Sequence, residues 1–201
     1  MACKSGNCGC SAARAGKRRG VFLDRDGVVN QGGLINKVED LKLIDGSAQA
    51  IADLRQAGMV VGLVTNQGGL SEDLEGNVRW KQRPMTREKL ADIHAELLRL
   101  LGPSAQPDFI EFCPHAKSIV CECRKPKPGM LLRAAQAHNI DLASSFMVGD
   151  MATDVQAGIN AGVTPLLVLS GFEAEQKDKC PPGTLIFPSL KEVARFILNY
   201  S

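Results

Sequence analysis

Four aspartates stand at points in the chain where an apolar run ends. Asp24 and Asp26 follow one such run, and Asp150 and Asp154 follow another. Residues two apart in an extended chain point the same way, so the first two carboxylates can face one site. Close carboxylates repel unless a cation or a shared proton lies between them, and Mg²⁺ prefers hard oxygen ligands. The aspartates therefore predict a magnesium site.

Two further residues supply groups that bind an anion. Thr65 ends a third apolar run, where its hydroxyl and the following backbone amides can hold an anion, and Lys125 brings a positive charge. Carboxylates, a metal, a hydroxyl and a lysine suit phosphoryl transfer: one carboxylate attacks phosphorus, the cations neutralise its oxygens and a second carboxylate handles the proton. Each residue alone has an ordinary role in a turn or on the surface. Their joint occurrence at successive strand ends favours catalysis.

A cluster of sulfur and imidazole side chains lies just before Lys125. Cys113, His115, Cys121 and Cys123 fall within eleven residues. Three thiolates and an imidazole are typical of a closed, structural zinc site, and such a metal can hold a short loop that lacks a core. The zinc would then orient Lys125. The alternative is a set of incidental thiols beside a surface histidine.

Apolar and amphipathic segments alternate along the chain, and they must position these side chains. Continuous apolar strands that alternate with helices predict an α/β fold, a Rossmann-like three-layer sandwich with a central, mainly parallel sheet. Ligands bind at the carboxyl ends of the strands in such sheets. Ser47, Thr86 and Ser189 are predicted helix caps, and Gly162 a helix end. The predicted strands are 21–23, 60–64, 108–112, 146–148 and 166–169.

Composition limits the remaining possibilities. The 201 residues include 24 Lys and Arg against 22 Asp and Glu, a net charge of +2, which gives no electrostatic argument for nucleic acid or membrane. No apolar run approaches the roughly 20 residues of a membrane span, and the polar N-terminus does not match a secretory signal. We expect a cytoplasmic protein with one domain over 20–201. Residues 1–19 read as a tail whose Cys3, Cys8 and Cys10 are free thiols or a second metal or redox site.

Taken together, the motifs resemble the haloacid dehalogenase (HAD) phosphatases. The similarity covers about residues 20–200, and the cysteine-containing stretch resembles more closely the subgroup that acts on heptose bisphosphate and histidinol phosphate. The motifs are Asp24-x-Asp26-Gly27-Val28, Leu63-Val64-Thr65-Asn66-Gln67, Cys121-Glu122-Cys123-Arg124-Lys125-Pro126 and Gly149-Asp150-x-x-x-Asp154.

The resemblance implies a role for each matched residue. Asp24 would be the nucleophile that becomes an aspartyl phosphate, and Asp26 would protonate the leaving oxygen and then activate water. Thr65 and Lys125 would hold the phosphoryl group. The remaining assignments are substrate contacts from Asn66, Gln67 and Arg124, Mg²⁺ ligation by Asp24, Asp150 and the backbone carbonyl of Asp26, support from Asp154, and zinc ligation by Cys113, His115, Cys121 and Cys123.

The resemblance also implies a substrate class. We expect a Mg²⁺-dependent phosphatase with a structural zinc ion, a small cap or none, and a small phosphorylated metabolite as its partner, the protein being a monomer or a small homo-oligomer. Heptose 1,7-bisphosphate is the leading substrate, and histidinol phosphate or another sugar phosphate is the alternative. The non-enzymatic alternative is a zinc-stabilised scaffold protein that has lost catalysis. The chain departs from the heptose enzymes at Met151, where they carry Lys, and in the insertion 71–84 around Trp80, a cap or an oligomer contact.

Overall fold

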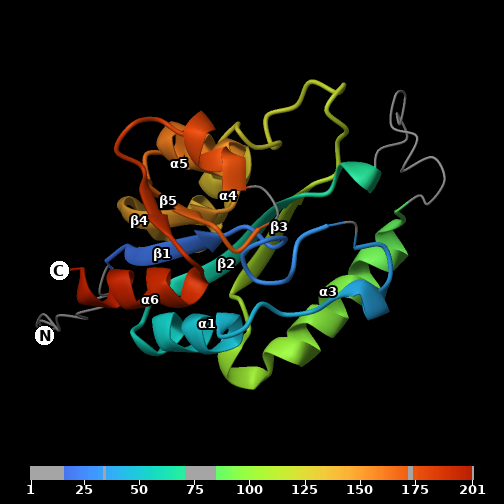
Figure 1. Cartoon of the computed structure of the whole chain (residues 1–201), viewed down its shortest axis with the longest axis horizontal. Coiled ribbons are helices and arrows are strands. Elements are labelled where there is room, and N and C mark those ends of the chain that lie inside the picture. The colour runs from blue at the N-terminus through green and yellow to red at the C-terminus, as the bar shows by residue number, and fades with distance from the viewer. Residues whose placement is uncertain (1–15, 34, 71–84, 172–173, 201) are drawn as a thin grey trace, which may run out of the picture.

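One parallel sheet organises the protein. The computed structural model describes residues 16–33, 35–70, 85–171 and 174–200, and six strands in these ranges pair in the order β3-β2-β1-β4-β5-β6 (Figure 1). All five neighbouring pairs are parallel. The strands are β1 Arg18–Leu23, β2 Val60–Asn66, β3 Phe109–Cys113, β4 Ile140–Gly149, β5 Thr164–Val168 and β6 Leu185–Phe187.

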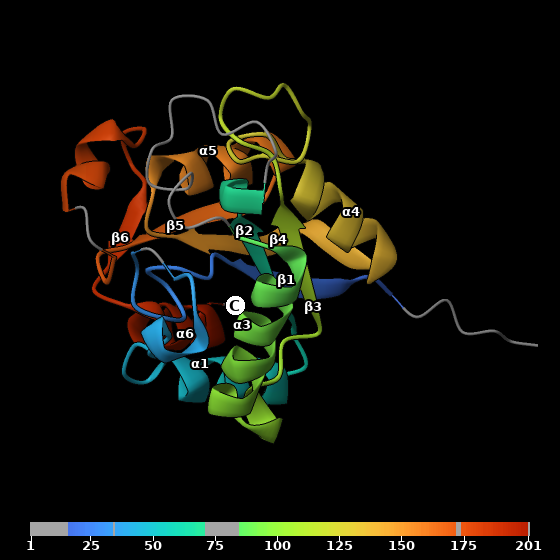
Figure 2. The ribbon, with the colours of Figure 1, turned by 90° about the vertical axis from the view of Figure 1, so that its right-hand side faces the viewer.

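Helices cover both faces of this sheet, as Figures 1 and 2 show. On one face lie α1 (Ser47–Gln56), α3 (Arg87–Leu101) and α6 (Leu190–Asn199); on the other lie α4 (Gly129–Ala137) and α5 (Ala152–Ala161). Successive side chains of a strand point to opposite faces, so Val21 and Leu23 of β1 join the first core and Phe22 joins the second. This confirms the predicted three-layer sandwich. Short 3-10 turns occupy Val38–Asp40, Gly68–Leu70, Pro103–Ala105 and Ala174–Lys179.

The ends of the helices follow the sequence signals closely. Thr86 caps α3 by accepting a hydrogen bond from the backbone N–H of Lys89, Ser189 caps α6, and Gly162 ends α5 in the left-handed conformation. The prediction that Ser47 caps α1 was wrong. Ser47 is the first helical residue, and the cap position belongs to Gly46, whose φ of 76° suits glycine.

Two features of the sheet lay outside the sequence prediction. Strand β1 begins at Arg18, within the segment expected to be a tail, and its first residues pair with β4. The edge strand β6 is only three residues long, and two of its three apolar residues, Leu185 and Ile186, are exposed, so it carries little of the hydrophobic pattern that identifies a strand.

The order of the strands brings the acidic segments together. Strand β1 lies between β2 and β4, and all three are parallel. Asp24 follows β1, Thr65 stands near the end of β2, and Asp150 follows β4. Their side chains therefore lie at one edge of the sheet, as expected for the ligand site of such a fold. No helix in the described ranges is long and apolar enough to cross a membrane.

Candidate active site

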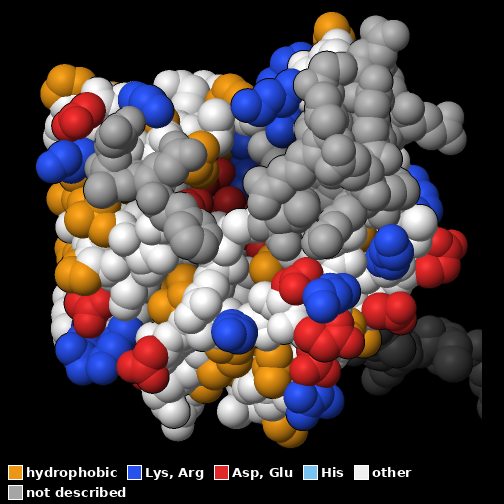
Figure 3. Space-filling view, turned by 45° about the vertical axis from the view of Figure 1, so that its right-hand side comes forward, with side chains coloured by type: hydrophobic (Ala, Val, Ile, Leu, Met, Phe, Trp, Pro, Cys, Tyr) orange, Lys and Arg blue, Asp and Glu red, His pale blue; other side chains and the backbone are white. Residues whose placement is uncertain are grey.

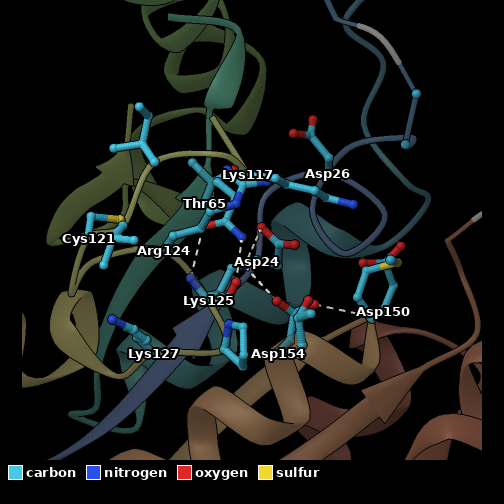
Figure 4. A pocket seen from close by; sticks show the side chains of 18 residues that line it. Asp24, Asp26, Thr65, Lys117, Cys121, Arg124, Lys125, Lys127, Asp150 and Asp154 are labelled. Atoms are coloured by element: carbon cyan, nitrogen blue, oxygen red, sulfur yellow. Dashed lines mark hydrogen bonds and ion pairs between the residues drawn. The ribbon is translucent and has the colours of Figure 1, made fainter. Parts of the chain in front are cut away.

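A pocket of about 950 Å³ opens at this edge of the sheet, and most of the predicted site residues line it. Figure 3 shows acidic side chains at the floor of a hollow and Lys and Arg side chains along its wall. Figure 4 shows the same region from close by. The lining includes Asp24, Asp26, Thr65, Asn66, Arg124, Lys125, Asp150 and Asp154. Segments distant in the sequence thus form one site.

The floor of the pocket is built around the ammonium group of Lys125. Its Nζ lies 3.0 Å from Asp24 Oδ1 and 2.7 Å from Asp154 Oδ1, and it donates a hydrogen bond to the backbone carbonyl of Val64 at 2.8 Å. The side chains of Lys125 and Asp154 are each only 1% exposed. A buried charge requires partners of this kind, so Lys125 is fixed between Asp24 and Asp154.

Burial and charge shift the pKa values of this group. Burial raises the pKa of Asp24 to about 7; the charge of Lys125 opposes this rise, and those of Asp154 and Asp26 add to it. Burial, with the charges of Asp24 and Asp154, raises the pKa of Asp150 to about 8. For Lys125, burial alone would lower the pKa, but the charges of Asp154 and Asp24 outweigh it and raise it. The site thus holds more negative charge than its single buried ammonium balances.

A metal ion fits this excess of carboxylates. Oxygens of Asp24, Asp150 and Asp154 lie within 4.8 Å of one another. Asp154 is engaged by Lys125 and accepts a hydrogen bond from the backbone N–H of Met151 at 3.0 Å. Asp150 Oδ1, in contrast, is buried and has no hydrogen-bond partner among the described residues. An oxygen of this kind is a suitable ligand for a hard cation.

Two glycines give the Asp150 carboxylate its space. A Cβ atom at Gly27 or at Gly171 would collide with Asp150 Oδ2. Gly27 also has φ +86°, a conformation that side chains disfavour. The turn after β1 and the segment after β5 can therefore approach Asp150 closely because both lack a side chain at these points.

Asn66, the last residue of β2, and Gln67, which follows it, fix other residues of the site by hydrogen bonds. Asn66 exchanges two hydrogen bonds with the backbone of Lys125: Asn66 Nδ2 donates to the carbonyl at 3.2 Å, and the Lys125 N–H donates to Asn66 Oδ1 at 3.1 Å. Gln67, only 7% exposed, donates to Thr65 Oγ1 at 2.9 Å and to Asp26 Oδ2 at 3.3 Å. Both residues were expected to contact substrate, which stays a prediction; Asn66 lines the pocket, and the observed bonds of the two side chains orient Lys125, Thr65 and Asp26.

Asp26 is held by further residues that sequence reasoning did not single out. Asn30 Nδ2 donates to Asp26 Oδ1 at 2.9 Å, and the Arg25 guanidinium donates to both carboxylate oxygens. Arg25 stands between two aspartates in the motif, which was the available signal. Its burial, 1% exposed, could not be inferred from an arginine in a polar run.

The predicted zinc ligands converge. The sulfur atoms of Cys113, Cys121 and Cys123 lie 3.2 to 3.8 Å apart, and His115 Nδ1 lies 3.3 Å from Cys123 Sγ and 3.6 Å from Cys113 Sγ. A tetrahedral ion at ~2.3 Å from each sulfur needs sulfurs about 3.8 Å apart. The four side chains could therefore hold a zinc ion, and Arg124 and Lys125 follow directly.

Cationic side chains also line the pocket, around the aspartates. Lys117, Arg124 and Lys127 all line it (Figure 4). The Arg124 side chain is anchored, since its Nη1 donates to the backbone carbonyl of His115 at 2.8 Å. Lys127 is 2.6 Å from Glu122 Oε1. Lys117 lies within the Cys and His loop, and sequence reasoning gave it no role.

Two predictions fall outside the described residues. They are the tail cysteines Cys3, Cys8 and Cys10 and the insertion 71–84 with Trp80. The proposed roles of these segments therefore stay predictions.

Known proteins share this fold and these motifs. The family model described as HAD-hydrolase-like matches residues 122–193. D-glycero-beta-D-manno-heptose-1,7-bisphosphate 7-phosphatase of Pseudomonas putida is 36% identical over 182 residues, covering 89% of this chain and 98% of that protein. The corresponding 7-phosphatase of Thermosynechococcus vestitus is 40% identical over 168 residues, 77% of this chain and 81% of that protein.

A solved structure gives the same result. The D,D-heptose 1,7-bisphosphate phosphatase of B. bronchiseptica, crystallised with magnesium and phosphate, superimposes with a TM-score of 0.80 at 36% identity, over 91% of this chain and 99% of that chain. Fold and site thus define the class: a phosphoric monoester hydrolase of the HAD type. The chain belongs to the family of the D-glycero-D-manno-heptose-1,7-bisphosphate 7-phosphatases.

Proposed function

We propose that this protein removes the 7-phosphate of D-glycero-D-manno-heptose 1,7-bisphosphate through an aspartyl phosphate. The observation that carries the proposal is the position of Asp24 at the floor of the pocket, 3.0 Å from Lys125 Nζ and beside Asp150. The names of the matched relatives supply the substrate. The Lys and Arg side chains that line the pocket suit a substrate with two phosphate groups.

The reaction takes place in two displacements at phosphorus. In the first, a carboxylate oxygen of Asp24 attacks, the ester P–O bond breaks, and its electron pair stays on the leaving oxygen, which takes a proton from Asp26. In the second, water attacks the phosphorus of the aspartyl phosphate and gives a proton to Asp26. The bond to Asp24 breaks, restoring its carboxylate and releasing inorganic phosphate.

Groups around Asp24 stabilise the negative charge that develops on the phosphoryl oxygens. Lys125 and the hydroxyl of Thr65 line the pocket beside Asp24 and can bind these oxygens. Asp24, Asp150 and the backbone carbonyl of Asp26 would hold Mg²⁺, which neutralises phosphoryl charge when it is bound. Asp154 fixes Lys125 through their 2.7 Å ion pair.

The second phosphate of the substrate would meet the cationic side chains that line the pocket. Arg124 is held toward the pocket by its bond to His115, and Lys117 extends from the same loop. We propose that a zinc ion on Cys113, His115, Cys121 and Cys123 holds this loop, so that the metal fixes the position of both cations without touching substrate.

Phosphate release from a substrate panel tests the proposal. The panel holds both anomers of the heptose 1,7-bisphosphate, the heptose 7-phosphate, histidinol phosphate and common sugar phosphates, each with and without MgCl₂. We expect the bisphosphate to exceed the others in kcat/KM by at least ~100-fold, about 3 kcal/mol. A preference for histidinol phosphate would contradict the proposed substrate and would leave the proposed reaction mechanism unchanged.

A further inference from the structure

A buried arginine lies next to the reacting groups. Arg25 is among the largest fully buried side chains of the described residues, at 1% exposed. Its Nε lies 3.1 Å from Asp26 Oδ1, and its Nη2 lies 3.0 Å from Oδ1 and 2.8 Å from Oδ2 of the same carboxylate. Two guanidinium nitrogens thus contact both oxygens of the Asp26 carboxylate.

The remaining nitrogen of Arg25 meets a histidine of another layer. Nη1 lies 3.3 Å from Nε2 of His94, which comes from the middle of α3. Burial, together with the charge of Arg25, lowers the pKa of His94 to about 4. A neutral imidazole has one nitrogen that accepts a hydrogen bond, so His94 Nε2 can accept a hydrogen bond from Arg25 Nη1. The His94 ring also packs edge-on against Phe112 of β3, with centroids 6.2 Å apart.

We infer that Arg25, supported by His94, is a positioning residue that orients the carboxyl group of Asp26 toward the leaving oxygen. Asp26 is 26% exposed and follows the end of β1, so its side chain needs fixed neighbours to keep one rotamer. Asn30 and Gln67 contribute one hydrogen bond each, and Arg25 contributes the bidentate pair. Position within about 0.5 Å matters for proton transfer.

The inference rests on the proposed function, because the proposed mechanism makes Asp26 the proton donor of the first displacement. A structural role of Arg25 and a role in orienting this proton donor have different consequences. A purely structural Arg25 would affect all substrates alike. A residue that orients the proton donor matters most when the leaving oxygen is basic, and little when the leaving group departs without a proton.

Two aryl esters distinguish these roles: phenyl phosphate, whose leaving oxygen is basic, and p-nitrophenyl phosphate, whose leaving group is stable as an anion. The quantity compared is kcat/KM, which reports steps up to the aspartyl phosphate if its formation is irreversible. We expect Arg25→Met to lower kcat/KM for phenyl phosphate by ~100-fold and for p-nitrophenyl phosphate by less than ~5-fold.

Variants at His94 keep the test decisive if Arg25→Met does not fold. His94→Leu removes the acceptor for Nη1, and we expect the same selective loss at ~10-fold. His94→Gln restores an acceptor oxygen and should recover most of it. His138→Leu is the matched control: this histidine stacks on Phe109 at 4.6 Å and does not line the pocket, so both esters should react as with the unaltered protein.

Equal losses on both esters, or no loss, in folded His94→Leu would overturn the inference. The esters do not depend on the identity of the natural sugar, so a different physiological substrate leaves the test intact. Asp24→Asn measured alongside distinguishes the other failure. If that variant still hydrolyses either ester, the proposed function fails in its nucleophile, whatever the Arg25 and His94 variants do.

Discussion

Lys125 Nζ lies 2.7 Å from Asp154 Oδ1, and both side chains are 1% exposed. This ion pair joins the segment after the Cys and His cluster to the first turn of α5. The same ammonium is 3.0 Å from Asp24. Lys125 therefore holds Asp24 and Asp154 together and is also a candidate phosphate ligand.

Lys125→Met is expected to destabilise the protein. It leaves the carboxylates of Asp24 and Asp154 buried without their cation, which costs about 3–5 kcal/mol. The loss should be smaller at pH 6 than at pH 8, because burial raises the pKa of Asp24 to about 7 and this carboxyl group can take up a proton at pH 6. Urea unfolding without Mg²⁺ measures it. Lys127→Met, which breaks an exposed pair with Glu122, should cost less than ~1 kcal/mol; equal costs would contradict this account.

Magnesium binding should depend on pH. In the metal-free protein, the raised pKa values of Asp24, about 7, and Asp150, about 8, mean that the folded state holds protons that the unfolded state has released above about pH 4. Stability without metal should therefore fall as the pH rises toward 8. Mg²⁺ needs the ionised carboxylates, so the increase in Tm on adding MgCl₂ should be larger at pH 8.5 than at pH 6.

The control for this prediction is Asp150→Asn, which removes the charge of the carboxylate whose Oδ1 has no partner among the described residues. The variant should show little magnesium-dependent increase in Tm at either pH. An increase in the unaltered protein that is the same at pH 6 and pH 8.5 would show that these carboxyl groups do not control binding.

The position of Asp150 should depend on a glycine. In Gly171→Ala the new Cβ collides with Asp150 Oδ2, so we expect Mg²⁺ affinity to fall ~10-fold. Gly16→Ala is the control, because a Cβ there meets nothing within 4 Å. Titration calorimetry with MgCl₂ measures both. Unchanged affinity in Gly171→Ala would mean that Asp150 does not ligate the metal.

Zinc content should follow the cysteine cluster. Cys123→Ala removes a sulfur that lies 3.2 Å from Cys113 Sγ and 3.6 Å from Cys121 Sγ. The purified variant should contain about one equivalent less zinc per chain and a weaker kcat/KM, since the loop carries Arg124 and Lys125. Cys180→Ala, whose sulfur donates to the backbone carbonyl of Gln176, should keep its zinc. Full zinc content in Cys123→Ala would refute the site.

Sequence reasoning succeeded where local pattern determines structure. Buried parallel strands are continuous apolar runs, so the sheet and the positions of Asp24, Thr65 and Asp150 at strand ends could be predicted. The spacing of the cysteines was similarly informative, because four ligands close together in sequence can meet without a long-range rearrangement.

The partners of several site residues could not be predicted from the sequence, because they depend on contacts between distant segments. That Arg25 is buried and reaches His94, 69 positions away, follows from how α3 packs on the sheet. His94 reads from its sequence as an ordinary helix residue. Gln67 and Asn66 were expected to face substrate, and only the packing shows that they bond to Thr65, Asp26 and Lys125.

The most direct test of the account is to find the phosphorylated residue. The enzyme is mixed with substrate, quenched in acid, treated with borohydride to reduce an acyl phosphate to homoserine, and digested with trypsin. The peptide 20–25, Gly20-Val21-Phe22-Leu23-Asp24-Arg25, carries Asp24 as its only carboxylate side chain. We predict homoserine in place of Asp24, and none in Asp24→Asn. Turnover without this product would contradict the central claim, and so would homoserine in place of Asp26 in the peptide that begins at that residue.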